Sequence, residues 1–170
     1  MEYQLIAPRI PLGIETSAVE RVLSNRGIRL SDINHFLNTT DADILDPKLI
    51  MNITEGAKML VSHIYAGDNI FIQVDSDCDG FTSAALLINY INMFAPSYAQ
   101  SHIFYRLHNG KEHGLIPDTI PENVKLVIAP DSSSNDYDEH KILKDRGIDI
   151  LVIDHHEADK ISEYACIINN

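Results

Sequence analysis

Three short apolar runs of the sequence, at 69–74, 124–129 and 148–153, are each followed by acidic residues or histidines. The residues concerned are Asp75, Asp77, Asp79, Asp131, Asp154, His155 and His156. Carboxylate oxygens and imidazole nitrogens are ligands of divalent first-row metals, and Mn²⁺ suits such a mixed set. Carboxylates that lie close together repel one another unless cations bind between them. These residue types therefore predict a divalent-metal site, if the fold brings the three segments together.

Each part of this set has a simpler interpretation when it is taken alone. The pattern Asp-x-Asp-x-Asp-Gly at 75–80 also opens an EF-hand calcium loop. The twelfth position of that loop would be Leu86 instead of Glu, however, and a strand-like run precedes it. A plain acidic turn would explain the same aspartates, a helix cap would explain Asp131, and a structural histidine pair would explain residues 154–156. The three groups together favour the metal site.

The apolar pattern around these groups predicts an α/β fold. Nearly continuous apolar runs are typical of strands in a parallel sheet that is covered by helices on both faces. The expected strands are 69–74, 101–107, 124–129, 148–153 and 166–168. The expected helices between them are 81–94 and 135–146, and a loop is expected at 108–123. Ligands of such sheets bind at the carboxyl ends of the strands, which is where the acids and histidines stand.

The part of the sequence before residue 67 has a helical pattern. Helices are expected at 16–26, 31–37 and 47–66, because capping residues, apolar spacing and glycine stops frame each of them. We expect residues 1–66 to form an N-terminal lead-in with helices that pack on the core. Residues 67–170 are expected to form the α/β core itself.

Composition limits the class of protein further. The chain of 170 residues has a net charge of −12, whereas nucleic-acid binders are usually basic because phosphate neutralisation drives their binding. If the chain binds DNA, metals or further regions must supply positive potential. No apolar run approaches the roughly 20 residues of a membrane helix, and the start does not read as a signal peptide, so we expect no membrane association and a cytoplasmic location. Cys78 and Cys166 show neither zinc-knuckle nor CxxC spacing.

At the metal-type residues the sequence resembles a known family. Residues 75–80 resemble motif I of the RecJ branch of the DHH phosphoesterases, and residues 154–156, Asp-His-His, are the triplet that names this superfamily. Residues 23–28 and 36–38 are similar to the RecJ lead-in, and Asp131 matches the motif II aspartate. The resemblance covers nearly the whole chain, and motifs I and III are its most specific parts.

The resemblance implies a role for each of these residues. The metal ligands would be Asp75, Asp77, Asp79, Asp131 and His155. Of these, Asp131 would bridge two ions of Mn²⁺ or Mg²⁺. His156 would face the scissile phosphate, and Asp154 would orient the histidines, because metal-bound imidazoles need a hydrogen-bond acceptor behind them. The catalytic set would be Asp77, Asp79, Asp131, His155 and His156.

Other positions match or depart from the family pattern. Arg106 and His113 are similar to its arginine and aromatic-glycine-leucine segment, which implies contact with substrate phosphates. Gln73 stands where many superfamily members have a metal-binding histidine. The family also has a fourth motif with a further aspartate and a second domain, both downstream of residue 170. The sequence is then either a fragment of a longer protein, truncated before those regions, or a natural truncation with a weakened second metal site; we expect a fragment.

The implied activity is two-metal hydrolysis of phosphodiesters. The resemblance implies 5′-to-3′ exonuclease digestion of single-stranded DNA, as in DNA repair and recombination. Two alternatives remain. One is a DHH phosphodiesterase for small substrates, such as short oligonucleotides or cyclic dinucleotides, which the RecJ-like lead-in disfavours. The other is a non-catalytic DHH module that binds replication or repair proteins. The acid cluster disfavours that module, because a protein without catalysis has no need of it.

Overall fold

The computed structural model describes residues 16–169, and contacts divide the chain into two units at residues 46 and 47. In the first unit the described elements are helix α1 (Ala18–Asn25), the 3-10 turn η1 (Leu30–Asp32), helix α2 (Ile33–Leu37) and the 3-10 turn η2 (Asp41–Asp43). Ser17 and Glu20 form a capping box at the start of α1, which satisfies amides that a helix end leaves without partners. This confirms the helix that the sequence predicts here.

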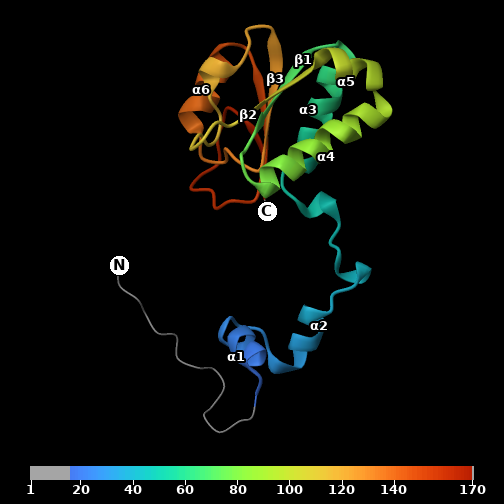
Figure 1. The fold of residues 1–170 in the computed structure, drawn as a ribbon, viewed down its shortest axis with the longest axis vertical. Coiled ribbons are helices and arrows are strands. Elements are labelled where there is room, and N and C mark those ends of the chain that lie inside the picture. The colour runs from blue at the N-terminus through green and yellow to red at the C-terminus, as the bar shows by residue number, and fades with distance from the viewer. Residues whose placement is uncertain (1–15, 170) are drawn as a thin grey trace. The chain divides into compact units, whose positions relative to one another are not determined.

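The second unit is a five-stranded parallel sheet with helices on both faces (Figure 1). Its strands are β1 (Asn69–Val74), β2 (Ile103–Leu107), β3 (Val124–Pro130), β4 (Asp149–Asp154) and β5 (Cys166–Asn169). Its other elements are η3 (Pro47–Leu49), α3 (Ile53–Ala66), α4 (Cys78–Phe94), α5 (Pro96–His102), η4 (Pro117–Thr119) and α6 (Tyr137–Asp145). The strand order is β2-β1-β3-β4-β5 and all pairs are parallel. The predicted fold class is therefore confirmed.

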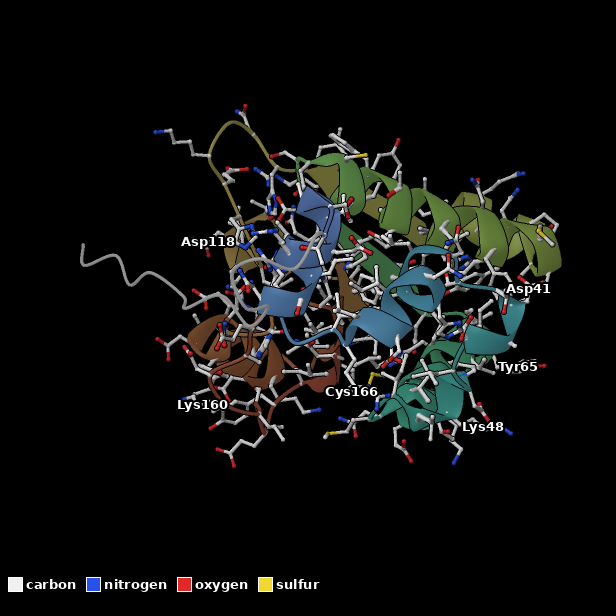
Figure 2. The ribbon with its side chains drawn as sticks, turned by 90° about the horizontal axis from the view of Figure 1, so that it is seen from below. Asp41, Lys48, Tyr65, Asp118, Lys160 and Cys166 are labelled. Atoms are coloured by element: carbon white, nitrogen blue, oxygen red, sulfur yellow. The ribbon has the colours of Figure 1, made fainter. Side chains whose placement is uncertain are left out.

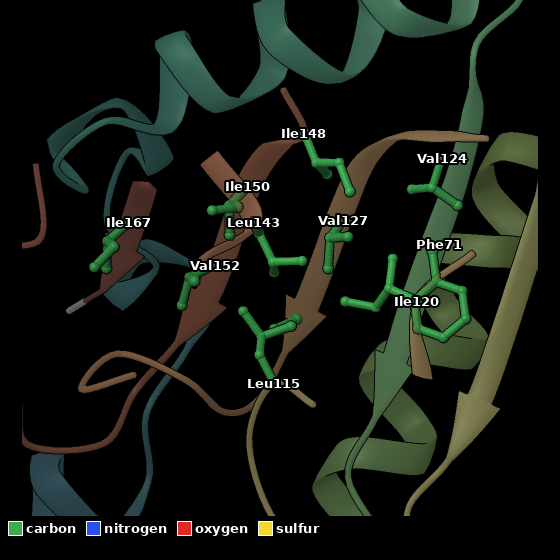
Figure 3. Packing of buried hydrophobic residues seen from close by; sticks show 11 residues of the cluster. Phe71, Leu115, Ile120, Val124, Val127, Leu143, Ile148, Ile150, Val152 and Ile167 are labelled. Atoms are coloured by element: carbon green, nitrogen blue, oxygen red, sulfur yellow. The ribbon is translucent and has the colours of Figure 1, made fainter. Parts of the chain in front are cut away.

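Apolar side chains of the strands alternate between the two faces of the sheet, and both faces are buried. The face beneath α6 holds one cluster: Phe71, Leu115, Ile120, Val124, Val127, Ala129, Leu143, Ile148, Ile150, Val152 and Ile167 (Figure 3). The opposite face, covered by α3 and α4, holds Ile70, Ile72, Val74, Ala84, Leu126, Ile128, Leu151 and Ile168. Burial on both faces explains why these strands read as continuous apolar runs.

Several element boundaries differ from the expected ones. Helix α4 begins at Cys78 instead of residue 81, because the Asp77 side chain caps it by accepting the Gly80 amide at 2.9 Å. Helix α5 was not predicted, and it shortens the expected strand at 101–107 to begin at Ile103. The expected helix at 47–66 is interrupted, because Asn52 has a left-handed backbone (φ 60°) and α3 starts after it.

The register of the sheet brings the strand ends to one edge. Ile72 of β1 pairs with Ile128 of β3, and Pro130 of β3 pairs with Ile153 of β4. The acids that follow these three neighbouring strands therefore leave the sheet at almost the same level. This edge is the carboxyl edge, where parallel sheets bind ligands.

Helix α6 carries a histidine in the core. His140 has no exposed surface, and within the described residues neither ring nitrogen has a hydrogen-bond partner. Burial lowers the pKa of His140, while the nearby Asp136 charge and the Ser133 backbone oppose this effect. A buried polar group without a partner at full hydrogen-bond geometry costs free energy, so His140 lowers the stability of the fold.

We expect His140→Leu to raise the free energy of unfolding at pH 7 by about 1–2 kcal/mol, because it removes two unpaired polar atoms. The folded state binds a proton on His140 more weakly than the unfolded state does. Stability from this residue is therefore complete above the unfolded pKa of about 6.5 and declines as the pH falls below it. Urea unfolding at pH 7 and pH 5.5 measures both effects.

The matched control is His140→Gln, which removes the titration but keeps a buried polar group. It should flatten the difference between pH 7 and pH 5.5 without the gain at pH 7. An equal gain in both variants would contradict the role assigned to the unpaired nitrogens.

Candidate metal and phosphate site

Asp131, His155 and His156 meet at the carboxyl edge of the sheet. One ligand atom from each lies within 4.8 Å of the other two, and no other such group of three occurs among the residues that the structure describes. The His155 Nε2 atom is 3.1 Å from Asp131 Oδ1. The rings of His155 and His156 are 4.6 Å apart between centroids. The Asp131 carboxylate and the His155 imidazole are suitable ligands for Mn²⁺, and the second imidazole lies beside them.

The backbone at Asp131 turns sharply at the end of β3. Asp131 has a left-handed conformation (φ 70°), and its amide donates to the Ile153 carbonyl oxygen at 2.7 Å. The side chain is buried, and burial together with the negative charge of Asp77 raises the pKa of Asp131. A carboxylate held in such surroundings gains most when a cation binds, because the cation offsets both costs.

Asp154 accepts four hydrogen bonds. The His155 amide (2.7 Å), the His156 amide (3.2 Å) and His156 Nδ1 (2.7 Å) all bind Oδ1, and the Ser134 amide binds Oδ2 at 3.1 Å. Burial opposes ionisation of Asp154, but these hydrogen bonds outweigh it and lower its pKa to about 2. Asp154 thus fixes the ring of His156 and leaves Nε2 available to a ligand.

Two residues that were not predicted from the sequence, Ser134 and Asn169, form a hydrogen-bond network next to His156. Asn169 at the end of β5 donates from Nδ2 to Ser134 Oγ at 2.8 Å and to the His156 carbonyl oxygen at 2.9 Å. Ser134 in turn binds Asp154. Asn169 also pairs with Asp154 in the sheet. Its position directly after a predicted apolar run, like that of the acids, was the one signal that could have drawn attention to it.

The loop after β4 is held against the start of α6. Asn135 Nδ2 donates to the Glu157 carbonyl oxygen at 2.9 Å, and the Tyr137 hydroxyl donates to the Lys160 carbonyl oxygen at 2.8 Å. The ammonium group of Lys160, labelled in Figure 2, lies 4.0 Å from the centre of the Tyr137 ring. These contacts restrict the segment that follows the two histidines.

Asp77 and Asp79 belong to the first turn of α4. Asp77 caps the helix, whereas Asp79 lines an open depression. The lining residues of this depression are Asp79, Thr82, Ser83, Leu86, Asp131 and His155. A Cβ atom at Gly80 would lie 2.6 Å from the Asp75 carbonyl oxygen, so only glycine lets this turn pack so closely on the end of β1. The depression therefore joins residues from β1–α4, β3 and β4.

Asp75 is surrounded by histidines. Its Oδ1 lies 3.1 Å from His108 Nδ1 and accepts the Ser76 amide at 2.7 Å, and its Oδ2 lies 2.6 Å from His113 Nδ1. Burial would raise the pKa of Asp75, but the hydrogen bonds from His108 and Ser76 and the charges of both histidines lower it overall. Both oxygens of Asp75 thus have partners in the protein.

Arg106 and His113 lie in different surroundings. One guanidinium nitrogen of Arg106 donates to both carboxylate oxygens of Glu112, at 2.9 and 2.7 Å. This nitrogen therefore stabilises the loop that contains Glu112. His113 is exposed, and its ring centroid is 6.4 Å from that of His156. The structure therefore places His113 near the cluster, while it pairs Arg106 with Glu112.

Comparison with known proteins shows the family of the chain. A family model described as the DHH family, N-terminal domain, matches residues 69–170. The chain belongs to the DHH family. A Bacillus subtilis (strain 168) protein, provisionally named SPbeta prophage-derived single-strand DNA-specific exonuclease YorK, is 41% identical over 170 residues, which are 100% of this DHH chain and 28% of that protein. The single-stranded-DNA-specific exonuclease RecJ of Haemophilus influenzae is 31% identical over 137 residues, 75% of this chain and 24% of that protein.

Solved structures show the same fold. RecJ from Thermus thermophilus in complex with Mn²⁺ superposes with a TM-score of 0.59 at 18% identity, over 75% of this chain and 18% of that one. An exonuclease RecJ bound to manganese superposes with a TM-score of 0.62 at 21% identity, over 74% of this chain and 33% of that one. This DHH chain spans about a quarter of the length of the two sequence relatives described above. No helix in the described part of the chain is long and apolar enough to cross a membrane.

Proposed function

We propose that this chain carries metal-binding residues of a phosphodiesterase that digests single-stranded DNA from the 5′ end. The observation that carries the proposal is the convergence of Asp131, His155 and His156 within 4.8 Å at the carboxyl edge of the sheet. The relatives named as single-strand DNA-specific exonucleases support DNA as the substrate. The RecJ structures with Mn²⁺ support a divalent metal.

The donor set fits two divalent ions. Asp79, Asp131 and His155 line one depression, and the Asp77 charge acts on Asp131. We therefore assign Asp77, Asp79, Asp131 and His155 as ligands, with Asp131 shared. When bound, the ions would lower the pKa of a water molecule and offset charge on the phosphate. Carboxylates and imidazole are ligands of Mn²⁺, and Mg²⁺ would favour the carboxylates alone.

The remaining residues orient the substrate in this proposal. His156 is held by Asp154 through Nδ1, so its Nε2 would contact the scissile phosphate. Asn169 donates hydrogen bonds to Ser134 and to the His156 carbonyl oxygen, and these bonds hold the backbone of His156 in place. Because the chain has a net charge of −12, phosphate would bind weakly until cations occupy the acid cluster.

The test is Mn²⁺-dependent cleavage by the 170-residue chain. Single-stranded DNA labelled at the 5′ or the 3′ end, and a cyclic dinucleotide, are incubated with and without Mn²⁺. We expect mononucleotides to appear first from the 5′ end and no reaction in EDTA. Preferential cleavage of the cyclic dinucleotide would replace the substrate assignment. Calorimetric Mn²⁺ binding without any cleavage would limit the chain to a metal-binding part of a larger enzyme.

A further inference from the structure

We propose that Asp75 and His108 are positioning residues, which hold the His113 ring beside His156 for contact with a phosphate oxygen, and that Asp75 does not bind metal. This inference rests on the proposed function for its substrate. It changes the role that the family resemblance implies for Asp75. It also gives a positioning role to the buried His108.

The first step is that both carboxylate oxygens of Asp75 have partners within the protein. One oxygen faces His108 Nδ1 and the Ser76 amide, and the other faces His113 Nδ1 at 2.6 Å. Asp75 has a protein partner on each of its oxygens, and it does not line the open depression that Asp79 and Asp131 line.

The second step is the anchoring of His108. Its side chain has no exposed surface, and both ring nitrogens face acceptors: Nε2 lies 2.7 Å from the Gly114 carbonyl oxygen and Nδ1 lies 3.1 Å from Asp75 Oδ1. The His108 amide donates to the Val74 carbonyl oxygen at 3.0 Å. His108 thus ties the end of β1 to the segment that carries His113. Because these contacts are buried, they stay short and directional.

The third step is the close packing beside His113. Gly114 has a left-handed backbone (φ +70°), and a Cβ atom there would lie 2.2 Å from Asp136 Oδ2. That same oxygen accepts the Leu115 amide at 2.8 Å. The two residues that follow His113 are therefore fixed, Gly114 by His108 and Leu115 by Asp136.

The fourth step is the direction of His113. Its Nδ1 is engaged by Asp75, its ring is 62% exposed, and it lies edge-on to His156 at 6.4 Å. Nε2 is then the ring atom left for a ligand. His156 is held in the same way, with Nδ1 on Asp154. When both nitrogens of such a ring carry protons, Nδ1 donates to the carboxylate and Nε2 can donate to a phosphate oxygen, so two rings side by side suit a phosphate group.

The variant Asp75→Asn tests whether Asp75 orients the His113 ring. The Ser76 amide must face an acceptor, so the amide oxygen of Asn takes the Oδ1 position and its NH₂ group faces His113 Nδ1. The NH₂ group can only donate, so the facing Nδ1 of His113 must lose its proton or the ring must turn away. We expect histidine ¹⁵N NMR to show a proton on Nδ1 of His113 in the wild type and its loss in the variant. His113→Gln assigns the signal.

Activity and metal affinity give the second readout. We expect Asp75→Asn and His113→Gln each to raise KM for single-stranded DNA roughly ten-fold, with a smaller change in kcat, because each loses an oriented contact. The double variant should be no worse than either single one. Calorimetric Mn²⁺ affinity should stay within about two-fold of the wild type, whereas Asp79→Asn should weaken it at least ten-fold. Lys111→Gln in the same loop is the matched control.

Two results would overturn the inference. If Asp75→Asn weakens Mn²⁺ binding as much as Asp79→Asn does, Asp75 is a metal ligand. If the protonation of His113 Nδ1 is the same in both proteins, Asp75 does not orient the ring. The NMR and calorimetric results do not depend on cleavage, so a failure of the proposed nuclease activity would be seen separately in the wild type.

Discussion

Asp131→Asn is expected to lower kcat/KM for Mn²⁺-dependent cleavage of single-stranded DNA by about a thousand-fold or more, because it removes the proposed shared ligand of two ions. The substitution keeps the size of the side chain. Asparagine also tolerates the left-handed backbone of this position, which has φ 70°. The loss should therefore come from chemistry and not from misfolding.

The same substitution should raise the melting temperature slightly in the absence of metal. Burial and the Asp77 charge raise the pKa of Asp131, so its ionised form is unfavourable in the folded state at neutral pH, and a neutral amide relieves this. Mn²⁺ should stabilise the wild type and have less effect on the variant. Thermal unfolding with and without Mn²⁺ measures both. Asp118→Asn is the control, because the Asp118 side chain is 97% exposed; the residue is labelled in Figure 2. Cleavage by Asp131→Asn at near wild-type rates would refute the assignment.

Asp154→Asn is expected to lower the free energy of unfolding by about 2–4 kcal/mol and to reduce cleavage strongly, because a buried set of charge-assisted hydrogen bonds is broken. The wild-type carboxylate accepts from three amides and from His156 Nδ1. An amide group has one oxygen, so its NH₂ must face a backbone donor, either the Ser134 amide or those after β4. In both orientations a buried donor loses its acceptor.

The pH dependence of this effect follows from the pKa of Asp154. The folded-state pKa is about 2, below the ordinary value of 3.8. Stability from the carboxylate is therefore present above pH 4 and is lost as the pH falls from about 4 to about 2, which corresponds to on the order of 2 kcal/mol. Urea unfolding of wild type and Asp154→Asn at pH 7, 4 and 2.5 should show the difference narrowing at low pH. A difference that stays constant would assign the stability to packing instead.

The strands could be predicted from the sequence because both faces of the sheet are buried. Each central strand then needs apolar side chains at consecutive positions, which gives the runs at 69–74 and 124–129. Helix α5 could not be predicted in this way, because its seven residues from Pro96 show no apolar period of their own. The start of α4 was also not predicted. Asp77 was interpreted as a metal ligand, and its capping hydrogen bond with the Gly80 amide appears only in the folded structure.

The candidate metal ligands could be predicted from the sequence because clustered carboxylates repel one another unless cations bind between them. Asp131, His155 and His156 lie together in the structure, and the order of neighbouring strands is the reason. The groups that the Asp75 carboxylate faces could not be predicted from the sequence. Its partner His108 is 33 residues away in the chain, and nothing in the spacing shows which carboxylate faces an imidazole and which faces the depression.

By itself, the sequence determined the parallel α/β class and the chemical character of the edge, since apolar runs and clustered acids are local properties of the chain. The bonds of Asp154 to the next two amides are also local. Only the tertiary structure decided the partners of Asn169, Asp75 and His113. Their hydrogen bonds join segments that meet through strand order and helix packing, so which donor faces which oxygen depends on the assembled fold.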